Sequence, residues 1–178
     1  TLTMKEIKVL GTGCSNCKNT VRLIEEVARS KGVEIRLEKV EEIGWGATGT
    51  GSGAFGPSGK WNVAPVDLVL TFRNYHNFSP ADRAAVNRST FDSLKPGGYY
   101  GIVDHTRRHN EPTTRENGRR VDPVLVIKEV QEAGFELVDF SNLYFKPTDA
   151  LALEVGNPAV NDRTDRVALL FRKTERRR

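Results

Sequence analysis

The sequence predicts an α/β domain in which a mostly parallel central β-sheet carries helices on both faces. Short apolar runs that suit buried strands alternate with stretches of helical periodicity along most of the chain. The run VDLVLTF, at residues 66–72, is almost unbroken, as is typical of a strand at the centre of a parallel sheet. The 178 residues are enough for one well-buried core and few for two. We therefore treat residues 1–178 as a single domain.

The amino-terminal part predicts a strand, a helix and a second strand. Residues 5–10 alternate and end in apolar residues, which favours a strand. Over residues 15–30 apolar side chains recur at helical spacing with charged residues opposite them, and Gly32 is a typical stop for such a helix. Residues 33–40 alternate apolar and charged side chains, which predicts a strand near an edge of the sheet.

A Gly-rich segment at residues 44–59 interrupts this order and is interpreted as a flexible loop or a junction. Residues 106–120 are expected to form a polar, mobile loop, and residues 146–165 a second long loop. The other expected helices are at residues 80–94 and 123–133, with Ser79 and Asp122 as caps and Gly134 as the stop of the second. The other expected strands are at residues 66–72, 99–105, 135–142 and 166–173.

The net charge of +4 comes largely from five arginines in residues 107–120 and from a basic carboxyl-terminal tail. Nucleic-acid binding is not expected, because no stacking aromatics or recognition helix accompany the charge. No apolar run approaches the roughly 18 residues that span a bilayer, so we expect no membrane segment and a cytoplasmic location. A small molecule is a possible partner.

The carboxyl-terminal part contains the segments FGPSGKWNVAP, VDLVLTFRNYHNF, LKPGGYYGIVDH, RVDPVLVIKEVQEAGFELV and RVALLFRK, spread over residues 55–173. This region resembles the carboxyl-terminal half of a bacterial family of predicted class I S-adenosylmethionine-dependent methyltransferases. The LKPGG turn between two strands is widespread in that class, and TFRNYHN is more specific. The resemblance implies a three-layer Rossmann-like fold of the class I methyltransferase type, with S-adenosylmethionine as a possible cofactor.

Residues 4–43 instead resemble the first strand–helix–strand unit of small thioredoxin-like, redox-active disulfide proteins, with GTGCSNC at the helix start as the specific part. In a class I methyltransferase the cofactor-binding unit would stand here. We therefore interpret the chain as an engineered or recombined chimera with a junction at 44–59 and a methyltransferase-like half at 60–173. Such an exchange can fold because both units present similar apolar surfaces. Strand 5–10 is then expected beside strand 66–72.

Candidate cofactor-binding residues follow the first strand. Gly11 and Gly13 lie between strand and helix, where a Rossmann-type fold brings backbone N–H groups to its ligand. A full GxGxxG motif would need glycine in place of Asn16, so the two glycines alternatively serve only a thioredoxin-type turn. Glu38 or Glu41 is the acid expected to bind ribose hydroxyls.

Cys14 and Cys17 stand at a helix start with two residues between them, as in a redox pair or half of a metal site. The helix dipole is expected to lower the thiol pKa of Cys14 and to favour reversible disulfide formation. A zinc ion would need further ligands, and no metal site is predicted because the histidines follow no metal-binding spacing; they are His76, His105 and His109.

Polar residues follow the central strand, at the edge where open α/β sheets bind ligands. The resemblance implies that this position faces the substrate and the transferred methyl group. The expected roles are cofactor binding by Arg73 and Asn74, a general base in His76, and a lining of the methyl path by Tyr75. The alternative is a hydrogen-bonded polar cluster around the turn.

Asp104 and His105 end the next strand at the same edge, where they would pair with the surroundings of His76 or cap the strand. Residues 107–120 are predicted to be a solvated loop rather than a lid. The leading functional interpretation is a methyltransferase-derived chimera without an efficient evolved activity. The alternatives are an S-adenosylmethionine-dependent methyltransferase and a thiol-disulfide oxidoreductase that uses Cys14 and Cys17.

Overall fold

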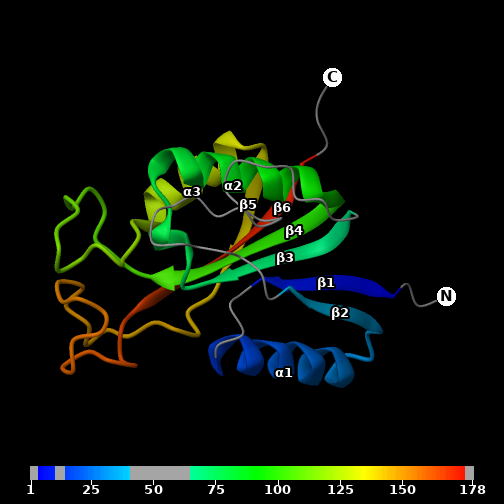
Figure 1. The fold of residues 1–178 in the computed structure, drawn as a ribbon, viewed down its shortest axis with the longest axis horizontal. Coiled ribbons are helices and arrows are strands. Elements are labelled where there is room, and N and C mark those ends of the chain that lie inside the picture. The colour runs from blue at the N-terminus through cyan, green and yellow to red at the C-terminus, as the bar shows by residue number, and fades with distance from the viewer. Residues whose placement is uncertain (1–3, 11–14, 41–64, 175–178) are drawn as a thin grey trace.

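The computed structural model describes residues 4–10, 15–40 and 65–174. Within these ranges six strands form one sheet in the order β2-β1-β3-β4-β6-β5 (Figure 1). Strands β2, β1, β3 and β4 run parallel, and β6 runs antiparallel between β4 and β5. The strands are β1 Lys5–Leu10, β2 Ile35–Val40, β3 Val66–Phe72, β4 Leu94–His105, β5 Phe135–Phe140 and β6 Arg166–Lys173. The mostly parallel sheet that the sequence predicts is confirmed.

Helices cover the two faces of the sheet unequally. Helix α1 (Ser15–Ser30) lies on one face, and α2 (Pro80–Ser93) and α3 (Pro123–Glu132) lie on the other (Figure 1). The expected start and stop signals are present: side-chain caps at Ser79 and Asp122, and left-handed glycines at Gly32 and Gly134. A short 3₁₀ helix at Tyr75–Asn77, which the sequence analysis does not predict, follows β3.

The first strand joins the two parts of the chain that resemble different families. β1 pairs with β2 on one side and with β3 on the other, and Ile7 stands opposite Leu68. This confirms the expectation that strand 5–10 lies beside strand 66–72. The strand order reverses at β1, and in open α/β sheets such a reversal opens a crevice at the carboxyl ends of the two diverging strands. Here those are the carboxyl ends of β1 and β3.

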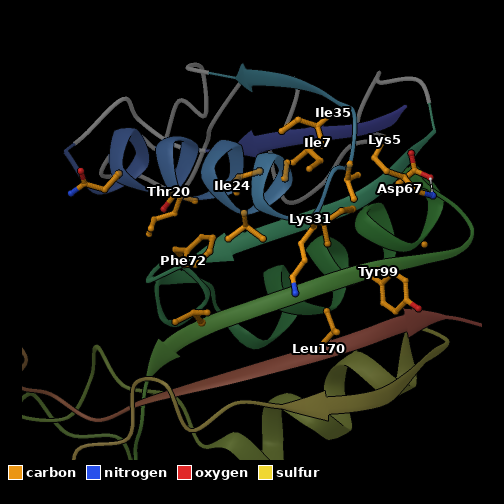
Figure 2. Close-up of a pocket in the computed structure, with 18 of the residues that line it drawn as sticks. Lys5, Ile7, Thr20, Ile24, Lys31, Ile35, Asp67, Phe72, Tyr99 and Leu170 are labelled. Atoms are coloured by element: carbon orange, nitrogen blue, oxygen red, sulfur yellow. Dashed lines mark ion pairs between the residues drawn. The ribbon is translucent and has the colours of Figure 1, made fainter. Parts of the chain in front are cut away.

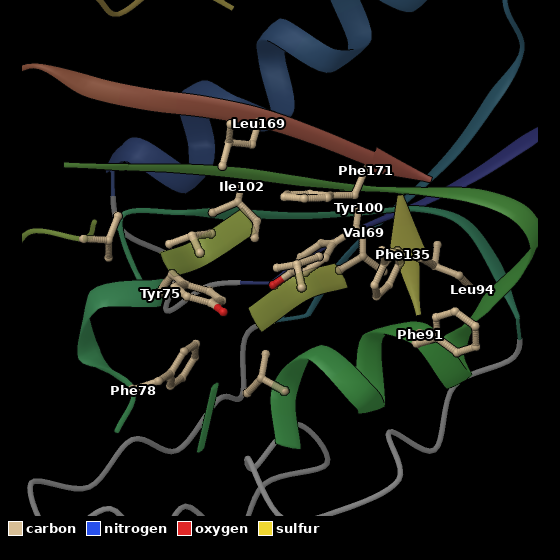
Figure 3. Close-up of a cluster of buried hydrophobic side chains, with 14 of the residues drawn as sticks. Val69, Tyr75, Phe78, Phe91, Leu94, Tyr100, Ile102, Phe135, Leu169 and Phe171 are labelled. Atoms are coloured by element: carbon tan, nitrogen blue, oxygen red, sulfur yellow. The ribbon is translucent and has the colours of Figure 1, made fainter. Parts of the chain in front are cut away.

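The principal core lies between the sheet and helices α2 and α3 (Figure 3). Alternate β4 residues such as Tyr100 and Ile102 point into it and are almost completely buried. Phe91 and Phe135 meet there edge to face, with ring centroids 5.2 Å apart. On the opposite face Tyr99 is 40% exposed, because α1 covers the sheet only in part. The uncovered area is a groove.

Strand β4 begins earlier than the sequence predicts. Leu94 pairs with Val66 and Tyr99 pairs with Leu68, so the intervening residues form an irregularity within the strand rather than a separate turn. Gly97 accommodates it with a φ of 72°. The predicted junction at residues 44–59 lies outside the described residues.

The expectation of a solvated, mobile loop at residues 106–120 is wrong at the carboxyl end of the loop. Arg120 is buried, and its guanidinium donates to both carboxylate oxygens of Asp149 at 2.9 and 3.2 Å. The N–H of Val121 donates to the carbonyl oxygen of His105 at 2.7 Å. The loop is therefore tied both to β4 and to the second loop at 146–165.

Over the described part of the chain, no helix has the length and apolar character needed to cross a membrane.

Candidate functional site

A groove of about 840 Å³ lies between α1 and the face of the sheet that α2 and α3 leave uncovered (Figure 2). Small-molecule pockets commonly measure about 300–1,000 Å³. The walls are largely apolar and come from α1 and from every strand except β5; they include Leu23, Ile24, Ile7, Phe72 and Leu170. The groove can therefore accept the apolar part of a small ligand.

One end of the groove, at the start of β1 and β3, is held by ion pairs. Lys95 Nζ donates to Asp67 Oδ2 at 2.9 Å, and Lys5 Nζ lies 3.7 Å from Asp67 Oδ1. Burial alone would raise the pKa of Asp67, but these lysines and the backbone N–H of Glu6 hold it below its ordinary value. Because this carboxylate is paired, it serves the structure and is not available to a ligand.

Beyond the opposite end of the groove, at the carboxyl edge of β3 and β4, lies a histidine–aspartate pair that does not itself line the groove. His76 Nδ1 lies 2.7 Å from Asp104 Oδ1, and the backbone N–H of His76 donates to Asp104 Oδ2 at 3.0 Å. The Asp104 side chain has no exposed surface, and that of His76 is 7% exposed. Of the two alternatives for Asp104, the structure shows the pairing with His76.

This pairing fixes the chemistry of the imidazole ring. A carboxylate can only accept, so Nδ1 of neutral His76 carries the proton and Nε2 presents its lone pair. The double contact with Asp104 also fixes the position of the ring. A histidine oriented in this way by a buried carboxylate is suited to act as a general base.

His105 stands beside this pair. Its ring centroid lies 6.0 Å from that of His76, and its Nδ1 lies 2.8 Å from Thr164 Oγ1. Burial lowers the pKa of His105 to about 4, with Arg166 and Arg73 contributing, although Asp104 acts in the opposite direction. His105 is therefore neutral near pH 7, and its buried Nε2 has no partner among the described residues.

Two arginines line the groove near its carboxyl-edge end. Arg73 follows β3 with a φ of 52°, and its N–H donates to the carbonyl oxygen of Val103 at 2.7 Å. Arg166 begins β6 opposite His105, and its guanidinium lies 5.7 Å from the ring centroid of Tyr144. The sequence predicts Arg73 at this edge but does not indicate Arg166 and Tyr144, because these two residues reach it only through the antiparallel insertion of β6.

The placement of Tyr75 differs from the expectation that it lines a methyl path. Its side chain is fully buried on the α2/α3 side, where the hydroxyl donates to Glu129 Oε2 at 3.0 Å and accepts from Asn87 Nδ2 at 2.8 Å. Burial raises its pKa far above the ordinary range. Tyr75 is thus a core residue, because the 3₁₀ turn after β3 directs it away from the groove.

The other candidate residues are more dispersed. Asn74 accepts a hydrogen bond from Asn77 within the turn, and Glu38 is exposed on β2. Cys17 lies in the first turn of α1, but Cys14 lies outside the described residues. The cofactor candidates Gly11 and Gly13 and the alternative acid Glu41 also lie outside them.

His109 lies away from the His76–Asp104 pair, 3.0 Å from Asp122, the cap of α3. In the described ranges no three His, Cys, Asp or Glu side chains gather as a metal site would require.

Comparison with known proteins separates the two parts of the chain. Residues 5–44 match the family model described as "Thioredoxin domain". This is less than half of the chain, so it shows a resemblance of the first strand–helix–strand unit only. No curated protein sequence matches the chain.

Solved structures resemble nearly the whole chain. The [4+2]-cyclase SpnF matches 96% of this chain and 74% of its own at 16% identity, with a TM-score of 0.55. A SAM-dependent methyltransferase from Methanosarcina mazei matches 96% and 92% at 14% identity, with a TM-score of 0.53. Human N-acetylserotonin methyltransferase, in complex with SAM, matches 96% and 48% at 17% identity, with a TM-score of 0.56. At these identities the likeness shows the fold alone: the chain has the Rossmann-like α/β fold of class I methyltransferases, with a thioredoxin-like sequence in its first unit.

Proposed function

We propose that this chain is an S-adenosylmethionine-dependent methyltransferase domain in which His76 removes a proton from the methyl acceptor. The observation that carries the proposal is the His76–Asp104 pair, at 2.7 Å, on the carboxyl edge of β3 and β4. Ligands of open α/β sheets bind at this edge. The fold shared with solved methyltransferases points to this reaction class by fold-level analogy.

The described residues fit such a cofactor in two respects. The groove offers an apolar wall of the size that an adenosine group needs. Glu38, the acid expected to bind the ribose hydroxyls, lies on β2, which ends at the same edge. The cofactor would supply the electrophilic methyl group. The predicted roles of Gly11 and Gly13 in holding it remain predictions.

The role of His76 follows from its hydrogen bonds. When the methyl group passes to a hydroxyl or amine acceptor and the thioether of the cofactor leaves, the acceptor's proton would pass to Nε2 of His76. Asp104 then stabilises the imidazolium through the Nδ1–H contact. General-base assistance of this kind commonly contributes about 10²–10⁴-fold to a rate.

The recombined origin of the chain also remains a proposal. It is supported by the thioredoxin match, which ends at residue 44, where the Gly-rich segment begins. If the first unit came from a thioredoxin-like protein, the methyltransferase-like part would supply the base while the first unit supplies only a compatible strand and helix. The activity would then be weak, as the sequence analysis expects of a chimera.

Binding and turnover test the proposal separately. S-adenosylhomocysteine should raise the melting temperature of the wild type, because a ligand at 100 times its Kd stabilises by about 2.7 kcal/mol. His76→Gln should bind it as tightly as the wild type but transfer methyl groups to phenolic acceptors about 10²–10⁴-fold more slowly. His109→Gln is the matched control, since His109 pairs with Asp122 away from the His76–Asp104 pair.

Two results would count against the proposal. A melting curve that millimolar S-adenosylhomocysteine leaves unchanged would contradict cofactor binding. Equal methyl-transfer rates for the His76 and His109 variants would contradict the role of His76 as the base. A disulfide-reductase activity that Cys14→Ser abolishes, without S-adenosylhomocysteine binding, would favour the oxidoreductase alternative.

A further inference from the structure

Arg73 and Arg166 both line the groove, unlike the arginines that the structure pairs with carboxylates. Arg83, Arg119, Arg120 and Arg172 each contact a carboxylate, the partners being Glu129, Glu154, Asp149 and Glu136. Arg73 and Arg166 form no such ion pair within the described ranges. The buried Nε of Arg166 has no acceptor there either.

These two guanidiniums lie close enough to affect each other. Burial lowers the pKa of Arg166, and the charge of Arg73 lowers it further. Two like charges at the edge of an apolar groove are unfavourable unless an anion joins them. The carboxylates of Asp162 and Asp104 oppose this lowering of the Arg166 pKa, but neither forms an ion pair with Arg166, and Asp104 is already bonded to His76.

We propose that Arg73 and Arg166 form an anion subsite that holds the carboxylate of an amphipathic ligand whose apolar body lies in the groove. Guanidinium groups bind carboxylates through charge-assisted, frequently bidentate hydrogen bonds, and the partnerless Nε of Arg166 is one such donor. The ring of Tyr144 stacks on the Arg166 guanidinium and holds it in place.

The subsite adjoins the proposed base. His105 stands opposite Arg166 across β4 and β6, and its ring lies 6.0 Å from that of His76. A ligand anchored by its carboxylate would thus have its other polar group near His76. This inference rests on the proposed function and narrows the acceptor to a hydroxylated organic acid. The carboxylate of the cofactor itself offers the same chemistry and is the second source to test.

Matched probes separate charge from shape. Calorimetric titration with 4-hydroxybenzoate and with its neutral analogue 4-hydroxybenzamide should show at least about tenfold tighter binding of the acid. Arg73→Met and Arg166→Met should each remove that preference. Arg172→Met is the control, because Arg172 lies at the far end of β6 and pairs with Glu136. Arg73 is exposed, so its variant decides the matter if Arg166→Met fails to fold.

The source of the anion is tested by titrating S-adenosylhomocysteine and methylthioadenosine, which lacks the amino-acid portion. If Arg73→Met loses affinity for S-adenosylhomocysteine but not for methylthioadenosine, the subsite binds the cofactor carboxylate. If it loses affinity for 4-hydroxybenzoate, the subsite binds the acceptor. Either result supports the subsite. Equal affinities of wild type and both variants for all charged probes overturn it. S-adenosylhomocysteine binding that persists in that case leaves the proposed function standing.

Discussion

His105 is the residue around which the charges of the site are arranged. It is 3% exposed, and Asp104, Arg73, Arg166 and His76 all act on its ring. Burial is the largest of the effects that lower its pKa to about 4. A histidine of this kind stays neutral where an exposed one would begin to titrate, so it adds no third positive charge to the arginine pair.

His105 should make stability depend on pH. The unfolded chain takes up a proton near pH 6.5, whereas the folded chain does so only at about pH 4, so stability falls as the pH falls through this interval. Across this interval the free energy of unfolding should fall by about 3 kcal/mol because of His105. Urea unfolding at several pH values should show this slope in the wild type and in His109→Gln, and a flatter one in His105→Gln. An unchanged slope in His105→Gln would contradict the assignment.

At the scale of elements, the two loops beyond the carboxyl edge of the sheet form one unit. Arg120 donates to Asp149 and also to the carbonyl oxygens of Leu153 and Thr106, both at 3.0 Å. Burial would raise the pKa of Asp149, but Arg120 and two backbone N–H groups hold it below its ordinary value. The Arg120–Asp149 ion pair holds together the two loops that adjoin His105 and its partner Thr164. It therefore stabilises the surroundings of the site without being part of it.

Removing one member of this pair should be costly, because it leaves the other as a buried, unpaired charge. We expect Arg120→Met to lose about 3–5 kcal/mol of unfolding free energy in urea at pH 7. Arg119→Met, which breaks the exposed pair with Glu154, should cost less than about 1 kcal/mol. The Asp149 contribution is present above its ordinary pKa and is lost as the pH falls toward the lower folded value, so the difference between wild type and Arg120→Met should shrink in acid. Equal losses at pH 7 for the two variants would show that the loops do not act as a unit.

At the scale of the whole molecule, β1 carries the contact between the thioredoxin-like and methyltransferase-like parts. Its backbone pairs with β2 and β3, and Val9 is 3% exposed. If β1 leaves the sheet, both β2 and β3 lose their backbone pairing with it. The described chain is therefore expected to unfold as a unit.

Val9→Ala should lower the free energy of unfolding by about 2 kcal/mol through loss of buried contacts. Far-ultraviolet circular dichroism reports on all helices. The near-ultraviolet signal comes from all aromatic side chains, the two tryptophans included, and contains the contribution of the buried tyrosines Tyr75 and Tyr100. Both signals should shift together in the variant. Separate transitions, with the tyrosine signal unmoved, would mean that the first unit is only loosely attached.

Local signals in the sequence determined the elements of this protein. The apolar run of β3, the caps at Ser79 and Asp122 and the stop at Gly134 each depend on neighbouring residues, so their positions could be read directly. The placement of polar residues at the carboxyl edge also followed from strand direction alone, which is why His76 was found.

Tertiary structure alone decided what these residues contact. The 3₁₀ turn sends Tyr75 into the core and His76 to Asp104, although the two are adjacent in the chain. Arg166 reaches the site because β6 is inserted antiparallel beside β4. The buried Arg120 finds its partner in Asp149, which is 29 residues further along the chain. The physical reason is that hydrogen bonds and ion pairs act over a few ångströms in space, whereas sequence patterns report only on neighbours along the chain.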